Sequence, residues 1–344
     1  MPGRRKGNRS RLAPAAALVT VALLFAGLVS VLPGKFGASA TDPVLRVVAT
    51  TTVFADLAAN VAGERALVSS LIPAGADPHT WEPSTAQLRA VAGADVFLYN
   101  GLGLEPWAER VIANVGRPGL TVVRLSEGLQ PREGVSFQVP GTDGSHASEH
   151  GRHSHDDEHA GDEDEHGHAH RHEDGDPHFW LDVTHAMHYV RRIEEALSRA
   201  DAAGAAYYQE RAERYLAELE KLNRWMAAEI QRIPPERRVL VTYHDAYWYM
   251  AERYGLELVG FLVRNPDREP APREMAELIR TIEQRGVPTV FAEPQVNPRF
   301  IEALAREAGV GVGVLYTDAL TDDVPTYIDM MRANARALVD GLAR

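Results

Sequence analysis

The chain is divided near its middle by residues 143–182, DGSHASEHGRHSHDDEHAGDEDEHGHAHRHEDGDPHFWLD. Residues 143–175 contain almost no apolar side chain. They cannot bury enough surface to offset the entropy of ordering, so we predict that they are disordered without metal. The stretch then ends in a compact, partly apolar pattern, Asp-Pro-His-Phe-Trp at 176–180. The pattern DPHxW occurs once more, at 77–81. Residues 176–180 are therefore one copy of a repeated motif and are distinct from the His-rich insertion.

Short β-branched runs alternate with helical patterns on both sides of this stretch. We expect strands at 45–51, 66–72, 95–99 and 120–125, and again at 238–243, 256–263, 289–292 and 310–316. Three of the expected helices begin at Glu105, Leu181 and His244. Such alternation predicts parallel sheets covered by helices. Residues 205–230 carry one apolar stripe at spacings of three and four, which predicts a helix of roughly 40 Å. The expected fold is α/β, with two lobes, each a mostly parallel sheet flanked by helices, joined by one long rigid helix.

The predicted boundaries follow from these patterns. Residues 42–200 form an N-terminal lobe that contains the insertion, 203–232 the linking helix, and 236–344 a C-terminal lobe. Residues 1–40 resemble an export signal, with a basic start, an apolar run at 15–32 and a small-residue cleavage site at 38–40. An uncleaved membrane anchor is the alternative, because the apolar run approaches the length that spans a bilayer. Either way the protein is exported, and is periplasmic or anchored outside the cytoplasmic membrane.

Charge and cysteine content exclude several classes of protein. The formal net charge is -12, and residues 143–176 hold twelve acidic residues against two arginines. No basic face is apparent, so we expect no nucleic-acid partner. The absence of cysteine excludes thiolate zinc sites, iron–sulfur clusters, disulfides and a lipidated cysteine. A transition metal would have to be held by nitrogen and oxygen, which means His with carboxylate.

Four candidate metal ligands share one kind of position. In parallel sheets, ligands bind outside the carboxyl ends of the strands. Three of the candidates follow predicted strands, and the fourth closes the His-rich insertion: His79, His178, His244 and Asp318. Two lobes with facing carboxyl edges would bring them together in the cleft between the lobes, as a nitrogen/oxygen set suited to zinc. A lone His after a strand is more often structural, and Asp318 alone could be a helix cap; the DPHxW repeat favours the ligand interpretation for the first two.

Other polar residues have weaker signals. Glu293 also ends a predicted strand, and it is a candidate outer contact or alternate ligand, or only a structural charge at a helix start. His185 and His188, three apart on a helix, suit a solvated face. Nine histidines of the insertion suit weak metal collection, with a solubilising tail as the alternative. They are His146, His150, His153, His155, His159, His166, His168, His170 and His172.

Five segments together resemble the solute-binding proteins of zinc and manganese ABC importers, the cluster A-I metal-binding family. They are GADPHTWEPSTAQLRAVAGADVFLYNGLGLEPW, DPHFWLD, VTYHDAYWYMAERYGL, FAEPQVNPR and LYTDAL. The resemblance implies two α/β lobes joined by a rigid helix, with a buried metal held by the four candidates above. Manganese-type members tend to carry a carboxylate at the third ligand position. Here that residue is His244, which favours Zn²⁺ over Mn²⁺. The family's zinc members also share a His-rich loop, whereas many relatives have a lipidated cysteine that this chain lacks.

The resulting hypothesis is high-affinity zinc capture and delivery without catalysis. The implied partners are an ABC importer permease with its cytoplasmic ATPase, and a metallochaperone as an additional partner; we expect a monomer. A manganese or other divalent-metal binding protein is the alternative within the family. Two alternatives from other classes are an exported zinc hydrolase, with Glu293 as general base, and a metal-dependent adhesin.

Overall fold

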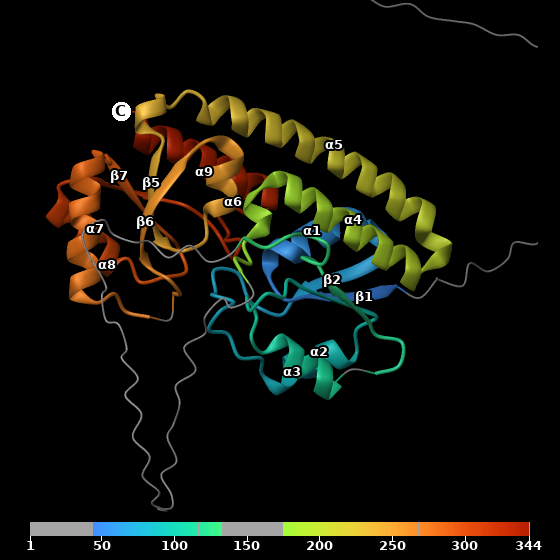
Figure 1. The fold of residues 1–344 in the computed structure, drawn as a ribbon. Helices are drawn as coiled ribbons and strands as arrows, with labels where there is room; N and C mark the ends of the chain where they lie inside the picture. Colours follow the sequence, from blue (N-terminus) through green and yellow to red (C-terminus); the bar gives the residue numbers. More distant parts are fainter. Residues whose placement is uncertain (1–43, 116, 133–174, 267, 344) are drawn as a thin grey trace, which may run out of the picture. The chain divides into compact units, whose positions relative to one another are not determined.

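The computed structural model describes residues 44–115, 117–132, 175–266 and 268–343 (Figure 1). The predicted export signal and the nine histidines of the insertion lie outside the described residues. Within those ranges, no helix combines the length and the apolar character needed to cross a bilayer.

The first half of the chain forms a four-stranded parallel sheet in the order β2-β1-β3-β4. Its strands are β1 (Leu45–Ala49), β2 (Ala66–Ser70), β3 (Val96–Tyr99) and β4 (Thr121–Arg124). Its helices are α1 (Thr52–Ala62), α2 (Thr85–Ala92), α3 (Ala108–Val115) and α4 (Val183–Ala200). Alternate residues of β1 point to opposite faces, so Val47 packs in the cluster that contains α1 and α4, whereas Val48 packs under α2 and α3.

The second half repeats the design, with a parallel sheet in the order β6-β5-β7-β8. Its strands are β5 (Val239–His244), β6 (Glu257–Val263), β7 (Thr289–Ala292) and β8 (Gly311–Val314). Its helices are α6 (Trp248–Tyr254), α7 (Pro272–Arg285), α8 (Arg299–Ala308) and α9 (Tyr327–Leu342). Both sheets occur where the sequence predicted them, and all their strand pairs are parallel.

The long helix α5 (Ala205–Ile230) connects the two halves and runs along α4 and α9 (Figure 1). All members of its predicted apolar stripe are buried: Tyr208, Ala212, Tyr215, Leu219, Leu222, Met226 and Ile230. They belong to a hydrophobic cluster that extends from β1 of the first sheet to α9 of the second. The α/β fold with a long connecting helix is therefore confirmed.

Three helix starts differ from the sequence prediction because polar side chains bind the backbone there. His244 was expected to begin a helix, but it ends β5, and α6 begins only at Trp248. Glu105 was expected in the first turn of α3; its carboxylate instead accepts hydrogen bonds from the backbone N–H groups of Asn100 and Gly101. Helix α4 begins after a 3₁₀ turn at 179–181, where the Asp182 side chain accepts a hydrogen bond from the Thr184 N–H.

Candidate metal centre

The two DPHxW motifs form the same local turn. In the first, Asp77 Oδ1 accepts a hydrogen bond from the backbone N–H of His79 at 2.9 Å. In the second, Asp176 Oδ1 accepts one from the backbone N–H of His178 at 3.0 Å. The intervening proline has no N–H, so the Asp carboxylate meets the His N–H two residues later. The repeated sequence therefore fixes the backbone in front of each histidine in the same way.

The second turn is also held by its surroundings. Asp176 Oδ1 lies 2.7 Å from His178 Nδ1. The Asn100 side chain donates to the carbonyl of Pro177 at 3.0 Å, and the Tyr249 hydroxyl donates to the carbonyl of Asp176 at 2.9 Å. The His178 turn is thus anchored to the residue that follows β3 of the first sheet and to α6 beside the second.

The two motif tryptophans do different things. The Trp180 ring lies 5.4 Å from the His178 ring and donates from Nε1 to the carbonyl of Thr317 at 2.8 Å. This bond ties the second motif to the residue that precedes Asp318. Trp81 Nε1 has no hydrogen-bond partner among the described residues. Trp81 packs instead against the apolar cluster under α2 and α3.

His244 ends the inner strand β5 and meets Glu293 at the end of the neighbouring strand β7. Glu293 Oε1 lies 2.7 Å from His244 Nδ1 and accepts a hydrogen bond from the His244 backbone N–H at 3.2 Å. Because a carboxylate accepts, these contacts place a hydrogen on Nδ1 of both His244 and His178. The second nitrogen of each ring, Nε2, is then the one directed at the candidate centre.

Asp318 follows β8, and its two oxygens differ in their contacts. Oδ2 accepts a hydrogen bond from Gln295 Nε2 at 3.2 Å. Oδ1 is buried and has no hydrogen-bond partner among the residues that the structure describes. It lies 3.6 Å from His178 Nε2. A buried carboxylate oxygen without a donor is costly unless something else binds it, which a cation would do.

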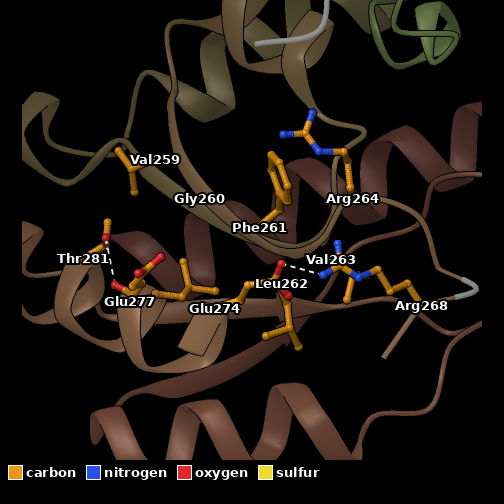
Figure 2. Close-up of a pocket in the computed structure, with 11 residues that line it drawn as sticks. Val259, Gly260, Phe261, Leu262, Val263, Arg264, Arg268, Glu274, Glu277 and Thr281 are labelled. Carbon is orange, nitrogen blue, oxygen red and sulfur yellow. Dashed lines mark hydrogen bonds and ion pairs between the residues drawn. The ribbon is translucent and has the colours of Figure 1, made fainter. Parts of the chain in front are cut away.

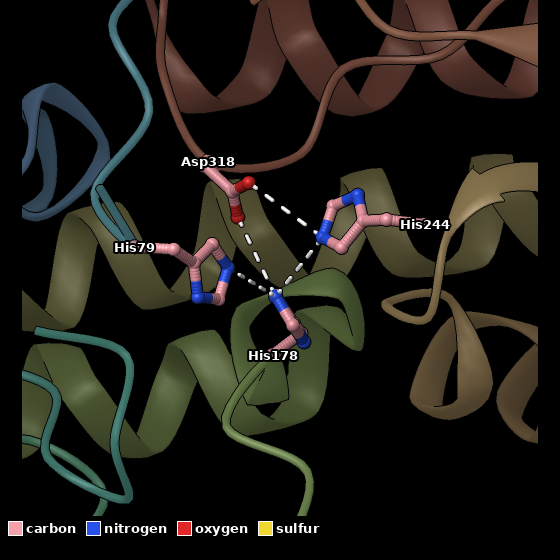
Figure 3. Close-up of side chains that lie close together, drawn as sticks. All are labelled: His79, His178, His244 and Asp318. Atoms are coloured by element: carbon pink, nitrogen blue, oxygen red, sulfur yellow. Dashed lines mark hydrogen bonds and ion pairs between the residues drawn. The ribbon is translucent and has the colours of Figure 1, made fainter. Parts of the chain in front are cut away.

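The four predicted ligands converge at one point (Figure 3). All four ligand atoms lie within 4.8 Å of one another. His178 Nε2 is 3.4 Å from His79 Nε2 and 3.3 Å from His244 Nε2. Zinc bonded at ~2.0–2.1 Å in a tetrahedron needs ligand atoms about 3.3–3.4 Å apart. The separations of His178 from the other two histidines therefore match a tetrahedral zinc site, and the remaining ligand atoms lie within 4.8 Å.

Burial within the cluster is uneven. His178, His244 and Asp318 are fully buried, whereas His79 keeps 7% of its surface exposed. His79 lies on the loop between β2 and α2, and the exposed part of the cluster is therefore on that side.

Burial and charge shift the pKa values of the cluster. Burial alone lowers the pKa of His244, but the charge and hydrogen bond of Glu293 and the charge of Asp318 outweigh it and raise that pKa to about 10. Burial raises the pKa of Asp318 to about 7. Burial likewise raises the pKa of Asp176 well above its usual value. The metal-free centre thus favours bound protons, which a cation would displace.

The other predicted residues lie outside the four-atom cluster. Glu293 contacts His244 on the side away from the centre, and both its carboxylate oxygens accept hydrogen bonds. His188 is at a part-exposed position of α4, where its Nε2 lies 2.9 Å from the carbonyl of Glu127. His185 was expected on a solvated face, but its ring packs edge-on against Phe179 and Tyr249.

The sequence did not reveal the residues that hydrogen-bond the candidate ligands and Glu293. Asp176, Thr317 and Gln295 were not singled out, although they bind His178, Glu293 and Asp318. The repeated Asp before Pro-His was a usable signal for Asp176. Nothing in the local pattern around Thr317 or Gln295 indicates their contacts, which join the ends of β7 and β8.

Figure 2 shows a separate pocket of about 240 Å³ between the edge strand β6 and α7. It is lined by residues 259–264 together with Arg268, Glu274, Glu277, Leu278 and Thr281. Arg268 and Glu274 pair with each other at 2.7 Å. None of the four clustered side chains lines this pocket, so it is independent of the candidate metal centre.

Comparison with known proteins agrees with the fold and with metal binding. The chain is 32% identical over 312 residues to the manganese-binding lipoprotein MntA of Halalkalibacterium halodurans, covering 90% of this chain and 92% of the relative. It is 28% identical over 342 residues to the iron-binding protein YfeA of Yersinia pestis, covering 96% of each. The periplasmic zinc-binding protein TroA of Treponema pallidum superposes with a TM-score of 0.72 at 28% identity, covering 87% of this chain and 99% of that one.

Residues 47–341 match a protein family described as ZnuA, zinc-uptake complex component A, periplasmic. The family binds a solute and is not a family of enzymes, and its members work outside the cytoplasmic membrane. The match covers both sheets and the connecting helix. The chain therefore belongs to the ZnuA family, as the substrate-binding component of an extracytoplasmic metal ABC transporter.

Proposed function

We propose that the protein captures Zn²⁺ with the four clustered side chains and delivers it to an ABC importer permease with its cytoplasmic ATPase. The observation that carries this proposal is the convergence of three imidazole nitrogens and one carboxylate within 4.8 Å, with His178 at tetrahedral distance from the other two histidines. Its residues are His79, His178, His244 and Asp318.

The geometry suits binding and release better than catalysis. Four protein ligands complete a tetrahedral zinc shell and leave no position for an activated water. Glu293, the base that a hydrolase would need, is buried, and its oxygens are occupied by His244 and Thr317. It therefore supports a ligand and does not face a substrate.

Manganese is the competing cargo, because several relatives are named for it, among them the one with 32% identity. The donor set supports zinc instead. Three of the four donors are imidazole nitrogens, whereas Mn²⁺ is better suited to carboxylate, carbonyl and water oxygens. Since nitrogen sites in general rank zinc above manganese, affinity alone does not identify the cargo, and uptake has to be measured.

The remaining predictions belong to the same proposal. Residues 42–200 and 236–344 act as two lobes about the linking helix 203–232. The His-rich insertion collects metal weakly and is separate from the tight site. The protein works as a monomer, with a metallochaperone as a further source of metal.

The test compares two histidine variants of the full chain without its export signal. His178→Ala should lose tight zinc binding in chelator competition. His188→Ala, which removes a histidine of α4 outside the cluster, should bind zinc as the unaltered protein does. In cells that lack the protein, the unaltered chain should restore uptake of radioactive zinc. Restoration of manganese uptake alone, or tight zinc binding by His178→Ala, would overturn the proposal.

A further inference from the structure

The carboxylate of Asp318 is held from one side by the loop after β7. Both of its oxygens lie near the histidines, since Oδ1 is 3.6 Å from His178 Nε2 and Oδ2 is 3.7 Å from His244 Nε2 (Figure 3). In the part of the chain that the structure describes, only Oδ2 is near hydrogen-bond donors: Gln295 Nε2 at 3.2 Å and Thr317 Oγ1 at 3.3 Å. The two oxygens are therefore not equivalent as metal donors.

Gln295 joins this carboxylate to the one behind His244. Its Nε2 lies 2.6 Å from Thr317 Oγ1, 2.9 Å from Glu293 Oε2 and 3.2 Å from Asp318 Oδ2. The Thr317 hydroxyl in turn donates to Glu293 Oε2 at 2.5 Å. With its hydrogen used there, Thr317 has none left for Asp318. The two N–H groups of Gln295 serve three acceptors, so one hydrogen is shared between two oxygens, and Gln295 is the remaining donor for Oδ2, its most distant acceptor.

We propose that Gln295 is a specificity-determining residue that makes Asp318 a one-oxygen ligand and so restricts the centre to four donors. This inference rests on the proposed function, because it takes the clustered side chains as the metal site. An oxygen that accepts a hydrogen bond gives less electron density to a cation, so Oδ1 becomes the donor. Zinc is satisfied by the resulting tetrahedron. Mn²⁺ favours octahedral, oxygen-rich coordination and would gain from Oδ2 as a further ligand.

The loop that carries Gln295 has contacts that do not involve its amide. The Val296 N–H donates to the carbonyl of Glu293, and the Arg299 N–H donates to Asn297 Oδ1. Gln295 itself is only part-buried. Replacement of its amide should therefore leave the loop in place, so that a change in metal preference can be measured on folded protein.

The experiment uses Gln295→Met, which keeps the length of the side chain and removes the donor. Gln295→Asn is the second variant, because it withdraws the amide by one methylene. Gln87→Met is the matched control: it removes the same amide from a hydrogen bond to the carbonyl of Leu71, outside the four clustered side chains. Melting of the metal-free proteins confirms that each variant is folded. Zn²⁺ and Mn²⁺ affinities are measured by chelator competition, and Co²⁺ absorption reports the number of ligands.

We expect the ratio of zinc to manganese affinity to fall on the order of tenfold in both Gln295 variants, as for the loss of one hydrogen bond to a charged group. The Co²⁺ spectrum should weaken as coordination rises above four, and Gln87→Met should show neither change. An unchanged ratio, or equal loss of both affinities, overturns the proposal for Gln295. If the unaltered protein and Gln87→Met bind neither metal, the proposed function fails instead.

Discussion

Replacement of Glu293 by Gln should remove most of the pH dependence of metal binding at neutral and alkaline pH. Glu293 Oε1 lies 2.7 Å from His244 Nδ1, and both side chains are fully buried. With Glu293 and Asp318 outweighing burial, the pKa of His244 is raised to about 10. The metal-free imidazole therefore carries an additional proton at neutral pH. That proton has to leave before Nε2 binds a cation.

The sign and the size of the change in metal affinity with pH follow from the raised pKa of His244. A proton held more tightly competes more strongly, so metal affinity is lost as pH falls below the pKa of His244. Affinity should change about tenfold per pH unit from neutral pH up to that value, or ~1.4 kcal/mol per unit. Burial also raises the pKa of Asp318 to about 7. Below it a second proton competes, and the slope should steepen toward about two.

Chelator competition at about pH 7, 8 and 9 measures the slope, and the buffer dependence of the binding heat counts the protons released. Glu293→Gln keeps the shape but removes the charge, so the slope should approach zero. At the highest pH the variant should bind ~10–100-fold more weakly, as is typical for a lost outer contact. Glu257→Gln, an exposed carboxylate paired with Arg285, is the control and should keep the original slope. A flat profile for the unaltered protein, or an unchanged slope in Glu293→Gln, would refute the reasoning.

Two further predictions concern the insertion and the residues on either side of it. A short Gly/Ser linker in place of residues 134–174 should lower the number of zinc ions bound but keep the tight dissociation constant, measured by isothermal titration; loss of the tight site would contradict this. Tyr249→Phe should speed zinc release by roughly tenfold in stopped-flow chelation. The Tyr249 hydroxyl hydrogen-bonds the backbone of both flanking segments, at Arg132 and at Asp176, each at 2.9 Å. Tyr254→Phe, on the same helix, should release zinc at the original rate, and equal acceleration would argue against a specific role for Tyr249.

The fold was predictable because the local and long-range signals agree. Each of the eight strands is a short run that contains valine, and α5 has one apolar stripe with a proline pair after it. Boundaries were less predictable where a polar side chain competes with the helix. Glu105 binds two backbone N–H groups in front of α3, and no feature of a single segment shows this.

The cluster was predictable for the residues that carry a motif or end a strand. His79 and His178 were marked by DPHxW, and His244 and Asp318 by their places after strands. The contacts of Gln295 depend on how β7 and β8 lie side by side. That is a tertiary relation, and the sequence around Gln295 contains no trace of it. Under the proposal for Gln295, the choice between zinc and manganese depends on the same contacts, which ligand type alone does not reveal.

The residues on either side of 133–174 offer an insertion point for protein engineering. The Asp176 N–H donates to the carbonyl of Arg132 at 2.9 Å, so the two ends lie next to each other. Gly175 has φ of 97°, and a Cβ there would lie 2.8 Å from Arg132 O, so this glycine must be kept. A fluorescent domain with adjacent termini could be inserted at this point. Its attachment would be only a few residues from His178, which makes the position suitable for a genetically encoded metal sensor.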